Sequence, residues 1–176
     1  MNIINFDLYK NLLKEKSGLI LSEDKSYLIE SRLTPVAKKW NYDTLDAMTS
    51  ALQGVPDPKL IEDIVEAMTT NETLWFRDNH PFRILQEKLL PEFGDRKSAQ
   101  SLRIWSAACS TGQEPYSVAM IIEEFRRQRP GRLRDVKITA TDISKSVLEV
   151  ARRGEYEMIA IGRGLSPERQ KQVFTP

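Results

Sequence analysis

The sequence predicts an α domain followed by an α/β domain: an N-terminal helical bundle, then parallel strands flanked by helices. Apolar residues recur at helical spacing over residues 1–70, and the connections between the segments are brief. Residues 101–141 instead hold two short strand-like runs with a long helical pattern between them. We therefore expect an all-α domain over 1–70, an interdomain linker and helix over 71–100, and a partial Rossmann-like domain over 101–176.

Four helices are expected in residues 1–70. Their apolar faces are formed by Phe6, Tyr9, Leu12 and Leu13; Tyr27, Leu28, Leu33, Val36, Ala37 and Trp40; Leu45, Met48 and Leu52; and Leu60, Ile64, Val65 and Met68. Residues that cap, open or end helices mark the boundaries: Gly18, Ser22, Asp43 or Thr44, Gly54, Pro56 and Pro58. Pro35 falls inside the second helix and is expected to kink or divide it, because proline lacks a backbone N–H.

The segment 71–100 is expected to contain one helix. Asn79 is a candidate N-cap, and the helix should end near Pro91. Its apolar residues are Phe82, Leu85, Leu89 and Leu90. The polar stretch from Gly94 to Gln100 is predicted to be a surface turn.

Residues 101–117 predict a strand, a turn and a helix start. Leu102, Ile104 and Trp105 form an apolar run typical of a buried parallel strand. Small residues then lead to Gly112, where the chain can turn tightly, and Pro115 suits the first turn of a helix. This order is that of the first unit of a Rossmann-like nucleotide site. With one glycine, the loop matches G-x-G-x-x-G poorly and does not indicate a pyrophosphate cradle.

Glu114 stands where a dinucleotide enzyme would leave room for phosphate. A carboxylate there would repel a pyrophosphate but suits a cation. S-adenosylmethionine carries an ammonium and a sulfonium and has no phosphate, so it fits better than NAD. Glu114 could equally serve only as an N-terminal acid that complements the helix dipole. This stretch by itself leaves both interpretations open.

A second strand over residues 136–141 places Asp142 just past its end. In dinucleotide folds an acid at this position accepts hydrogen bonds from two ribose hydroxyls, and we favour this role over simple capping of the next helix. Ser144 should cap that helix, which stops at Gly154. A turn over residues 162–164 and a short helix from Ser166 to Phe174 should follow.

Three segments in this order resemble the signatures of the CheR family, the chemotaxis protein methyltransferases that methylate glutamates on chemoreceptors. They are Thr69-Thr70-Asn71-Glu72-Thr73-Leu74-Trp75-Phe76-Arg77-Asp78, then Ile104-Trp105-Ser106-Ala107-Ala108-Cys109-Ser110-Thr111-Gly112-Gln113-Glu114-Pro115-Tyr116-Ser117, then Ala140-Thr141-Asp142-Ile143-Ser144. The resemblance implies a class I methyltransferase domain that uses S-adenosyl-L-methionine and releases S-adenosyl-L-homocysteine. Trp75 and Phe76 replace the family's usual pair of phenylalanines, and we expect them to pack between the domains.

The resemblance also implies roles for individual residues. Asn71, Thr73 and Arg77 match the set that lines the cofactor site from the interdomain segment, together with Glu114 and Asp142. Arg77 has a planar fork for a carboxylate, either of the cofactor or of the substrate glutamate. Glu114 would lie near the cofactor's amino acid end and Asp142 near its ribose.

The expected chemistry needs no general base and no metal. A glutamate side chain has a pKa near about 4.3 and is ionised at neutral pH, so its oxygen can attack the methyl group directly. Catalysis would then rest on proximity, alignment and desolvation. His80 and Cys109 are therefore not assigned as base and nucleophile.

Composition and charge constrain the partners. The net charge of +1 implies no polyanion partner, and five arginines near Pro130 are interpreted as a solvated loop, not a nucleic-acid site. A single cysteine excludes an internal disulfide, and neither a membrane span nor a signal peptide is visible, so we expect a cytoplasmic protein.

In the family, the helical domain is thought to face acidic receptor segments. Arg32, Lys38 and Lys39 could form such a basic face for the cytoplasmic domain of a methyl-accepting chemoreceptor.

The sequence supplies two strands of the family's larger sheet and then stops, so we expect it to be a fragment. The edge of strand 102–107 would then be unpaired and could self-associate.

Two functions remain: an S-adenosylmethionine-dependent O-methyltransferase acting on receptor glutamates, or a non-catalytic fragment whose helical domain docks on a receptor or regulator. A nicotinamide oxidoreductase is disfavoured by the single-glycine loop and by Glu114.

Overall fold

A computed structural model describes residues 3–95, 101–133 and 135–175. The chain divides into two compact units, residues 1–70 and residues 71–176. Residues 71–95, which we expected to form a linker and a helix, belong to the second unit. The predicted surface turn at 94–100 lies largely outside the described residues.

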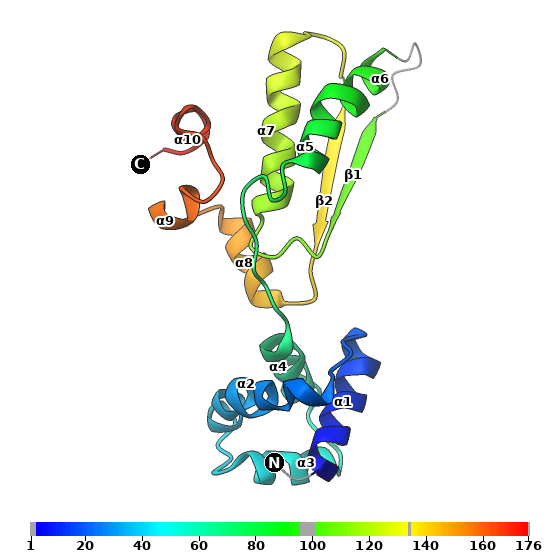
Figure 1. The fold of residues 1–176 in the computed structure, drawn as a ribbon, viewed down its shortest axis with the longest axis vertical. Helices are drawn as coiled ribbons and strands as arrows, with labels where there is room; N and C mark the ends of the chain where they lie inside the picture. The colour runs from blue at the N-terminus through cyan, green and yellow to red at the C-terminus, as the bar shows by residue number, and fades with distance from the viewer. Residues whose placement is uncertain (1–2, 96–100, 134, 176) are drawn as a thin grey trace. The chain divides into compact units, whose positions relative to one another are not determined.

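The first unit is a small helical bundle. Its elements are α1 (Ile3–Ser17), the 3-10 turn η1 (Glu23–Lys25), α2 (Ser26–Lys39), α3 (Leu45–Leu52) and α4 (Pro58–Met68), coloured blue to green in Figure 1. The hydroxyl of Thr44 accepts the N–H of Ala47 at 3.1 Å, which confirms Thr44 as the cap of α3. Ser22 precedes η1, not α2, and makes no side-chain cap.

Pro35 does not divide α2, which was one of the two outcomes that we expected of it. The helix continues from Ser26 to Lys39 through the proline. Leu33, Val36 and Ala37 are buried on either side of it, so packing of this apolar face outweighs the loss of one backbone donor. The core of the unit also contains side chains that are fully enclosed: Tyr9, Leu13, Ile29, Met48 and Ile64.

Arg32 connects α2 to the end of α4. Its Nη1 donates to the carbonyls of Met68 and Thr69, at 2.9 and 3.0 Å. The last carbonyls of a helix have no partner inside the helix, so this guanidinium satisfies the C-terminus of α4. Arg32 therefore has a structural role within this unit.

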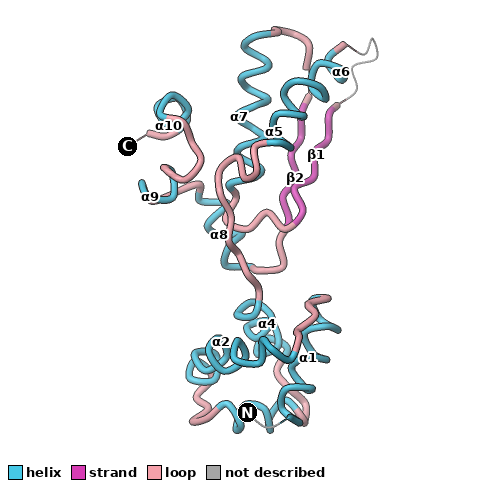
Figure 2. The backbone as a smooth tube through the Cα atoms, in the orientation of Figure 1, coloured by secondary structure: helices cyan, strands magenta, loops and turns pink. Residues whose placement is uncertain are grey.

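The second unit begins with a loop over 71–79 and continues as α/β structure. Its elements are α5 (His80–Ile84), the π-helical turn η2 (Leu85–Leu89), α6 (Leu90–Gly94), β1 (Leu102–Ala107), α7 (Gln113–Gln128), β2 (Val136–Thr141), α8 (Lys145–Arg153), α9 (Met158–Ile161) and α10 (Pro167–Val173). β1 and β2 pair in parallel, from Leu102 opposite Val136 to Ala107 opposite Thr141 (Figure 2).

Two expectations for the helix in segment 71–95 are wrong. Asn79 makes no side-chain cap, because its backbone lies at φ 46°. The helix does not end near Pro91 but runs to Gly94. A π-helical turn precedes the proline, and Leu90 N–H bonds back to Leu85 across it. This wider turn lets the helix pass a residue that has no N–H.

Helices cover one face of the two-stranded sheet. Ile104 and Ile138 pack with Leu90 and with Val118 of α7 in the core of the unit. On the other face Trp105 is 71% exposed, and its indole N–H donates to the Thr141 hydroxyl at 3.0 Å. The strand predicted to be buried is thus exposed at alternate residues, with Leu102 and Ile104 half-buried, since among the described elements helices pack on one face.

Candidate functional site

The predicted carboxylates meet at the ends where β1 and β2 finish. Asp142 directly follows β2, and its two oxygens accept the backbone N–H groups of Ser110 at 2.8 Å and Ser144 at 2.9 Å. Glu114 lies in the first turn of α7, where the hydroxyl of Ser106 donates to its Oε1 at 2.6 Å. Ser106 is the penultimate residue of β1, so each strand end holds one acid.

The loop between β1 and α7 has a backbone that glycine would adopt more easily. Ala108, Ser110 and Gly112 have φ values of 58°, 50° and 98°. Left-handed conformations of residues with a side chain cost about 1 kcal/mol or more, and they persist where surrounding contacts enforce them. Here the enforcing contacts are the bond from Ser110 N–H to Asp142 and the bond from Cys109 N–H to Thr141 O.

Gly112 is required by close packing as well as by its backbone. A Cβ at this position would lie 2.9 Å from the hydroxyl oxygen of Tyr156 and 3.0 Å from the Cβ of Ala151. Tyr156 also donates its hydroxyl to the carbonyl of Thr111 at 2.7 Å. The loop therefore packs against α8 and against the residues that follow α8.

Cys109 lies in the loop between β1 and α7, next to Ser110, whose N–H bonds to Asp142. Burial raises the pKa of its thiol, and the negative charges of Asp142 and Glu114 raise it further. The thiol is 1% exposed and stays protonated at neutral pH.

The other predicted site residues lie on the loop before α5. The carbonyl of Asn71 accepts the hydroxyl of Ser110 at 2.6 Å, which joins this loop to the one that holds Asp142. Thr73 is half-buried. Arg77 is exposed and donates Nη1 to the carbonyl of Glu72 at 3.1 Å. Within the described part of the chain, no hydrogen bond joins Arg77 to Glu114 or Asp142.

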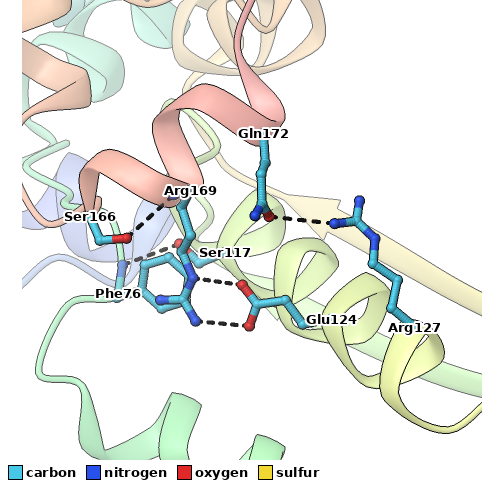
Figure 3. Close-up of polar contacts among 7 residues, drawn as sticks. All are labelled: Phe76, Ser117, Glu124, Arg127, Ser166, Arg169 and Gln172. Carbon is cyan, nitrogen blue, oxygen red and sulfur yellow. Dashed lines mark hydrogen bonds and ion pairs between the residues drawn. The ribbon is translucent and has the colours of Figure 1, made fainter.

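Phe76 and the residues around it are held by several contacts. Phe76 has φ 51°, its N–H donates to the hydroxyl of Ser117 at 3.1 Å, and its ring is 5% exposed. Arg169 of α10 stacks its guanidinium over that ring at 4.0 Å and pairs with Glu124 of α7 at 2.7 and 2.9 Å (Figure 3). Trp75 and Phe76, expected between the domains, pack in the core of the second unit.

A pocket of about 1170 Å³ opens beside α7 and the C-terminal segments. Aromatic rings line it, with Trp75 in edge contact with Tyr156 at 5.0 Å and with Phe174 at 5.5 Å. The buried Nε1 of Trp75 has no acceptor among the described residues. Tyr156, which lines this pocket, also bonds to the carbonyl of Thr111 in the loop before α7.

Sequence reasoning missed the residues that orient the predicted acids or support the loops near them. Ser106 and Ser110 were interpreted only as small loop residues, although each bonds to one of the predicted acids or to the segment at Asn71. A polar residue at the end of a strand next to an acidic helix start was the available signal. The contact of Arg169 with Phe76 had no local signal, because the two residues are far apart in the sequence. No group of three or more His, Cys, Asp or Glu side chains in the described residues could hold a metal ion.

A helical unit followed by a β-α-β unit, with acids at the strand ends, defines a Rossmann-like cofactor-binding protein with an added helical domain. Residues 4–69 match the family model described as CheR methyltransferase, all-alpha domain, and residues 71–176 match CheR methyltransferase, SAM binding domain. The chain therefore belongs to the CheR methyltransferase family, whose cofactor is S-adenosylmethionine. The family, fold class and cofactor predicted from the sequence are confirmed.

Similar proteins carry the same family name. The chain is 44% identical over 174 residues to the chemotaxis protein methyltransferase Cher2 of Pseudomonas putida, covering 98% of this chain and 63% of that protein. It is 46% identical over 171 residues to chemotaxis protein methyltransferase 1 of Pseudomonas aeruginosa, covering 97% and 62%. It is 48% identical over 162 residues to chemotaxis protein methyltransferase 1 of Vibrio cholerae, covering 92% and 58%. The chain thus spans less than two thirds of the length of these relatives. None of its described helices is long and apolar enough to cross a membrane.

Proposed function

We propose that this chain is the helical and cofactor-binding part of an S-adenosylmethionine-dependent O-methyltransferase that acts on glutamates of bacterial chemoreceptors. The observation that carries the proposal is the pair of acids beside the ends of adjacent strands: Glu114 is bonded to Ser106 at the end of β1, and Asp142 directly follows β2. A pyrophosphate would meet two negative charges here, whereas a cationic cofactor with a ribose finds matching groups.

The residues present fit this cofactor. Glu114 is exposed, and one of its oxygens is bonded to Ser106, so the other oxygen is available for an ammonium group. Asp142 is half-buried and held by two backbone N–H groups, which orient its carboxylate while lone pairs remain for ribose hydroxyls.

When bound, S-adenosylmethionine supplies a methyl group on a cationic sulfur. A substrate carboxylate would accept that methyl group as a methyl ester, and the cofactor would leave as the neutral thioether S-adenosylhomocysteine. The residues of this chain bind and orient, since the substrate glutamate is already ionised. Arg77 would position a carboxylate through its free guanidinium N–H groups.

Receptor contact through the basic residues of α2 also belongs to the proposal. Lys38 and Lys39 are exposed, and Lys39 pairs with Asp63 at 2.8 Å. Arg32 donates to the end of α4, so its contribution to a receptor surface would come in addition to that role. We expect Lys38 and Lys39 to attract acidic segments of the receptor's cytoplasmic domain.

Self-association through β1 is a separate part of the proposal. Among the described residues β1 pairs only with β2, and Trp105 is exposed on the open face. Such an edge favours pairing with another chain. A single monomeric species in sedimentation velocity across a wide concentration range would remove this part.

A transfer assay tests the function. Purified chain, S-adenosylmethionine with a tritiated methyl group and a receptor cytoplasmic fragment should yield base-labile methyl esters, and binding of S-adenosylhomocysteine should be measured in parallel. Cofactor binding together with transfer supports the proposal. Receptor association with neither cofactor binding nor transfer would support the alternative, a non-catalytic docking fragment.

A further inference from the structure

The guanidinium of Arg169 occupies a central place in the contacts around Phe76. Its Nε and Nη2 donate to the two oxygens of Glu124 at 2.7 and 2.9 Å, and its carbon lies 4.0 Å from the centre of the Phe76 ring (Figure 3). A bidentate pair fixes the plane of a guanidinium as well as its position. The side chains are only 27% and 22% exposed, so water weakens the pair less than it would a surface pair.

The residue beneath Arg169 is in a backbone conformation that needs support. Phe76 has φ 51°, and Asp78 and Asn79, two and three residues later, also have positive φ values of 63° and 46°. A non-glycine residue keeps such a conformation where neighbouring groups over-determine it. The guanidinium of Arg169 stacks on the ring of Phe76, and the N–H of Phe76 donates to the hydroxyl of Ser117 at 3.1 Å.

Trp75 is fixed by the same part of the chain. The carbonyl of Trp75 lies so close to Gly164, at φ 109°, that a Cβ there would overlap it. Gly164 belongs to the turn that leads into α10. Ser166 caps α10 by accepting the backbone N–H of Arg169 at 3.3 Å. The C-terminal turn and helix thus hold both residues that precede Arg77.

We propose that Arg169, paired with Glu124, is a positioning residue: it holds Phe76 in its left-handed conformation and so fixes the backbone from which the next residue, Arg77, extends. An effect of Arg169 on cofactor binding rests on the function proposed above. Arg169 itself touches neither predicted acid in the described residues. Its effect on ligand binding should therefore pass through Arg77.

Amide hydrogen exchange tests the structural half without any ligand. In Arg169→Gln the Phe76 N–H should exchange at least roughly tenfold faster, while amides in the middle of α7 keep their rates. Arg169→Lys keeps the charge without the planar fork. Its exchange rate at the Phe76 N–H should lie between those of the unmodified protein and Arg169→Gln. Arg127→Gln is the matched control, since Arg127 also joins α7 to α10, through Gln172 at 3.4 Å, without touching Phe76. Equal acceleration in α7, or none at Phe76, would overturn the proposal.

A double-mutant cycle tests the functional half. Calorimetry with S-adenosylhomocysteine should show binding weakened on the order of fivefold to tenfold by Arg169→Gln, and almost no further loss when that change is added to Arg77→Ala. Equal losses in both backgrounds would overturn the action through Arg77. If the unmodified protein does not bind this ligand, the proposed function fails, and exchange at Phe76 still decides whether Arg169 positions the loop.

Discussion

In the helical unit polar side chains bond to one another or to helix ends, whereas in the second unit polar side chains are held in place beside the ends of the two strands. Tyr9 and Thr49 bond at 2.9 Å inside the first core, and Arg32 is engaged at the end of α4. Glu114 and Asp142 are oriented by Ser106 and Ser110 yet remain partly or fully exposed. The first unit therefore resembles a closed scaffold and the second a prepared binding surface.

Backbone strain follows the same division. Among the described residues other than glycine, Asn41 has positive φ in the first unit, and the second has Phe76, Asp78, Asn79, Ala108 and Ser110. The first three lie on the loop that carries the predicted site residues Asn71, Thr73 and Arg77, and the other two lie on the loop before α7, which bonds to Asp142 through Ser110. Strained conformations at binding loops are maintained by surrounding contacts, so removing those contacts should affect the second unit locally.

The largest expected effect is in the core of the first unit. Leu33→Ala would leave a cavity around a fully buried side chain and should lower the free energy of unfolding by about 2–5 kcal/mol. Because every contact of Leu33 in the core lies in that unit, affinity of the folded protein for S-adenosylhomocysteine should not change. Chemical denaturation measures the free energy of unfolding, and calorimetry measures the affinity. A loss of affinity alongside the loss of stability would contradict the distinction between scaffold and binding surface.

A slightly smaller effect is expected at Gly164. Gly164→Ala adds a Cβ that overlaps the Trp75 carbonyl at a strained φ and should cost about 2–4 kcal/mol. Gly131→Ala is the matched control, because Gly131 also has positive φ, 78°, but has open space around it. Thermal unfolding should show the control losing much less. Equal losses would mean that φ, and not the contact with Trp75, sets the cost.

The acid pair also predicts a change in the titration of Cys109. Glu114→Gln and Asp142→Asn should each lower the pKa of the thiol, because each removes a negative charge that raises it. Cys109 is the only cysteine, so the pH profile of its alkylation, measured in mild denaturant-free conditions, reports this directly. An unchanged profile in both variants would contradict the shared location of the acids.

A smaller effect should appear in the first unit at low pH. Burial raises the pKa of Asp63, but hydrogen bonds from Lys39 and Trp40 and the charge of Lys39 outweigh it, so the pKa lies below its usual 3.8. A depressed folded pKa means stability that is present above the unfolded pKa and lost as pH falls through the folded one. This contribution to the free energy of unfolding should be below about 1 kcal/mol. Asp63→Asn should remove it, whereas Glu30→Gln, which changes an exposed acid, should not. Denaturation of both variants and the unmodified protein at pH 6 and pH 3 measures the difference.

Local patterns predicted most elements because their signals lie within a few residues. Thr44, Ser144 and Ser166 cap the helices that follow them, and Gly154 ends α8 in a left-handed conformation. The failures at Pro35 and Pro91 came from treating proline as a local stop, where packing or a π-helical turn carries the helix past it. The strand expected to be buried was predicted from Leu102, Ile104 and Trp105, of which Trp105 lies on the open face.

The candidate site was predictable only in part for the same reason. Glu114 and Asp142 follow directly from their positions at strand ends. The residues that orient them or support the neighbouring loop, such as Ser110 and Arg169, act across long sequence separations. Nothing in their local pattern distinguishes them from ordinary loop and surface residues.

The most direct test of the central claim measures the affinity of S-adenosylhomocysteine for four proteins by titration calorimetry. The unmodified chain should bind, and Glu114→Gln and Asp142→Asn should each weaken binding roughly tenfold or more, because each removes a charge-assisted hydrogen bond to the ligand. Glu149→Gln removes an exposed acid from α8 and should bind as the unmodified chain does. Equal affinities in all four proteins would contradict the account that these two acids form the cofactor site.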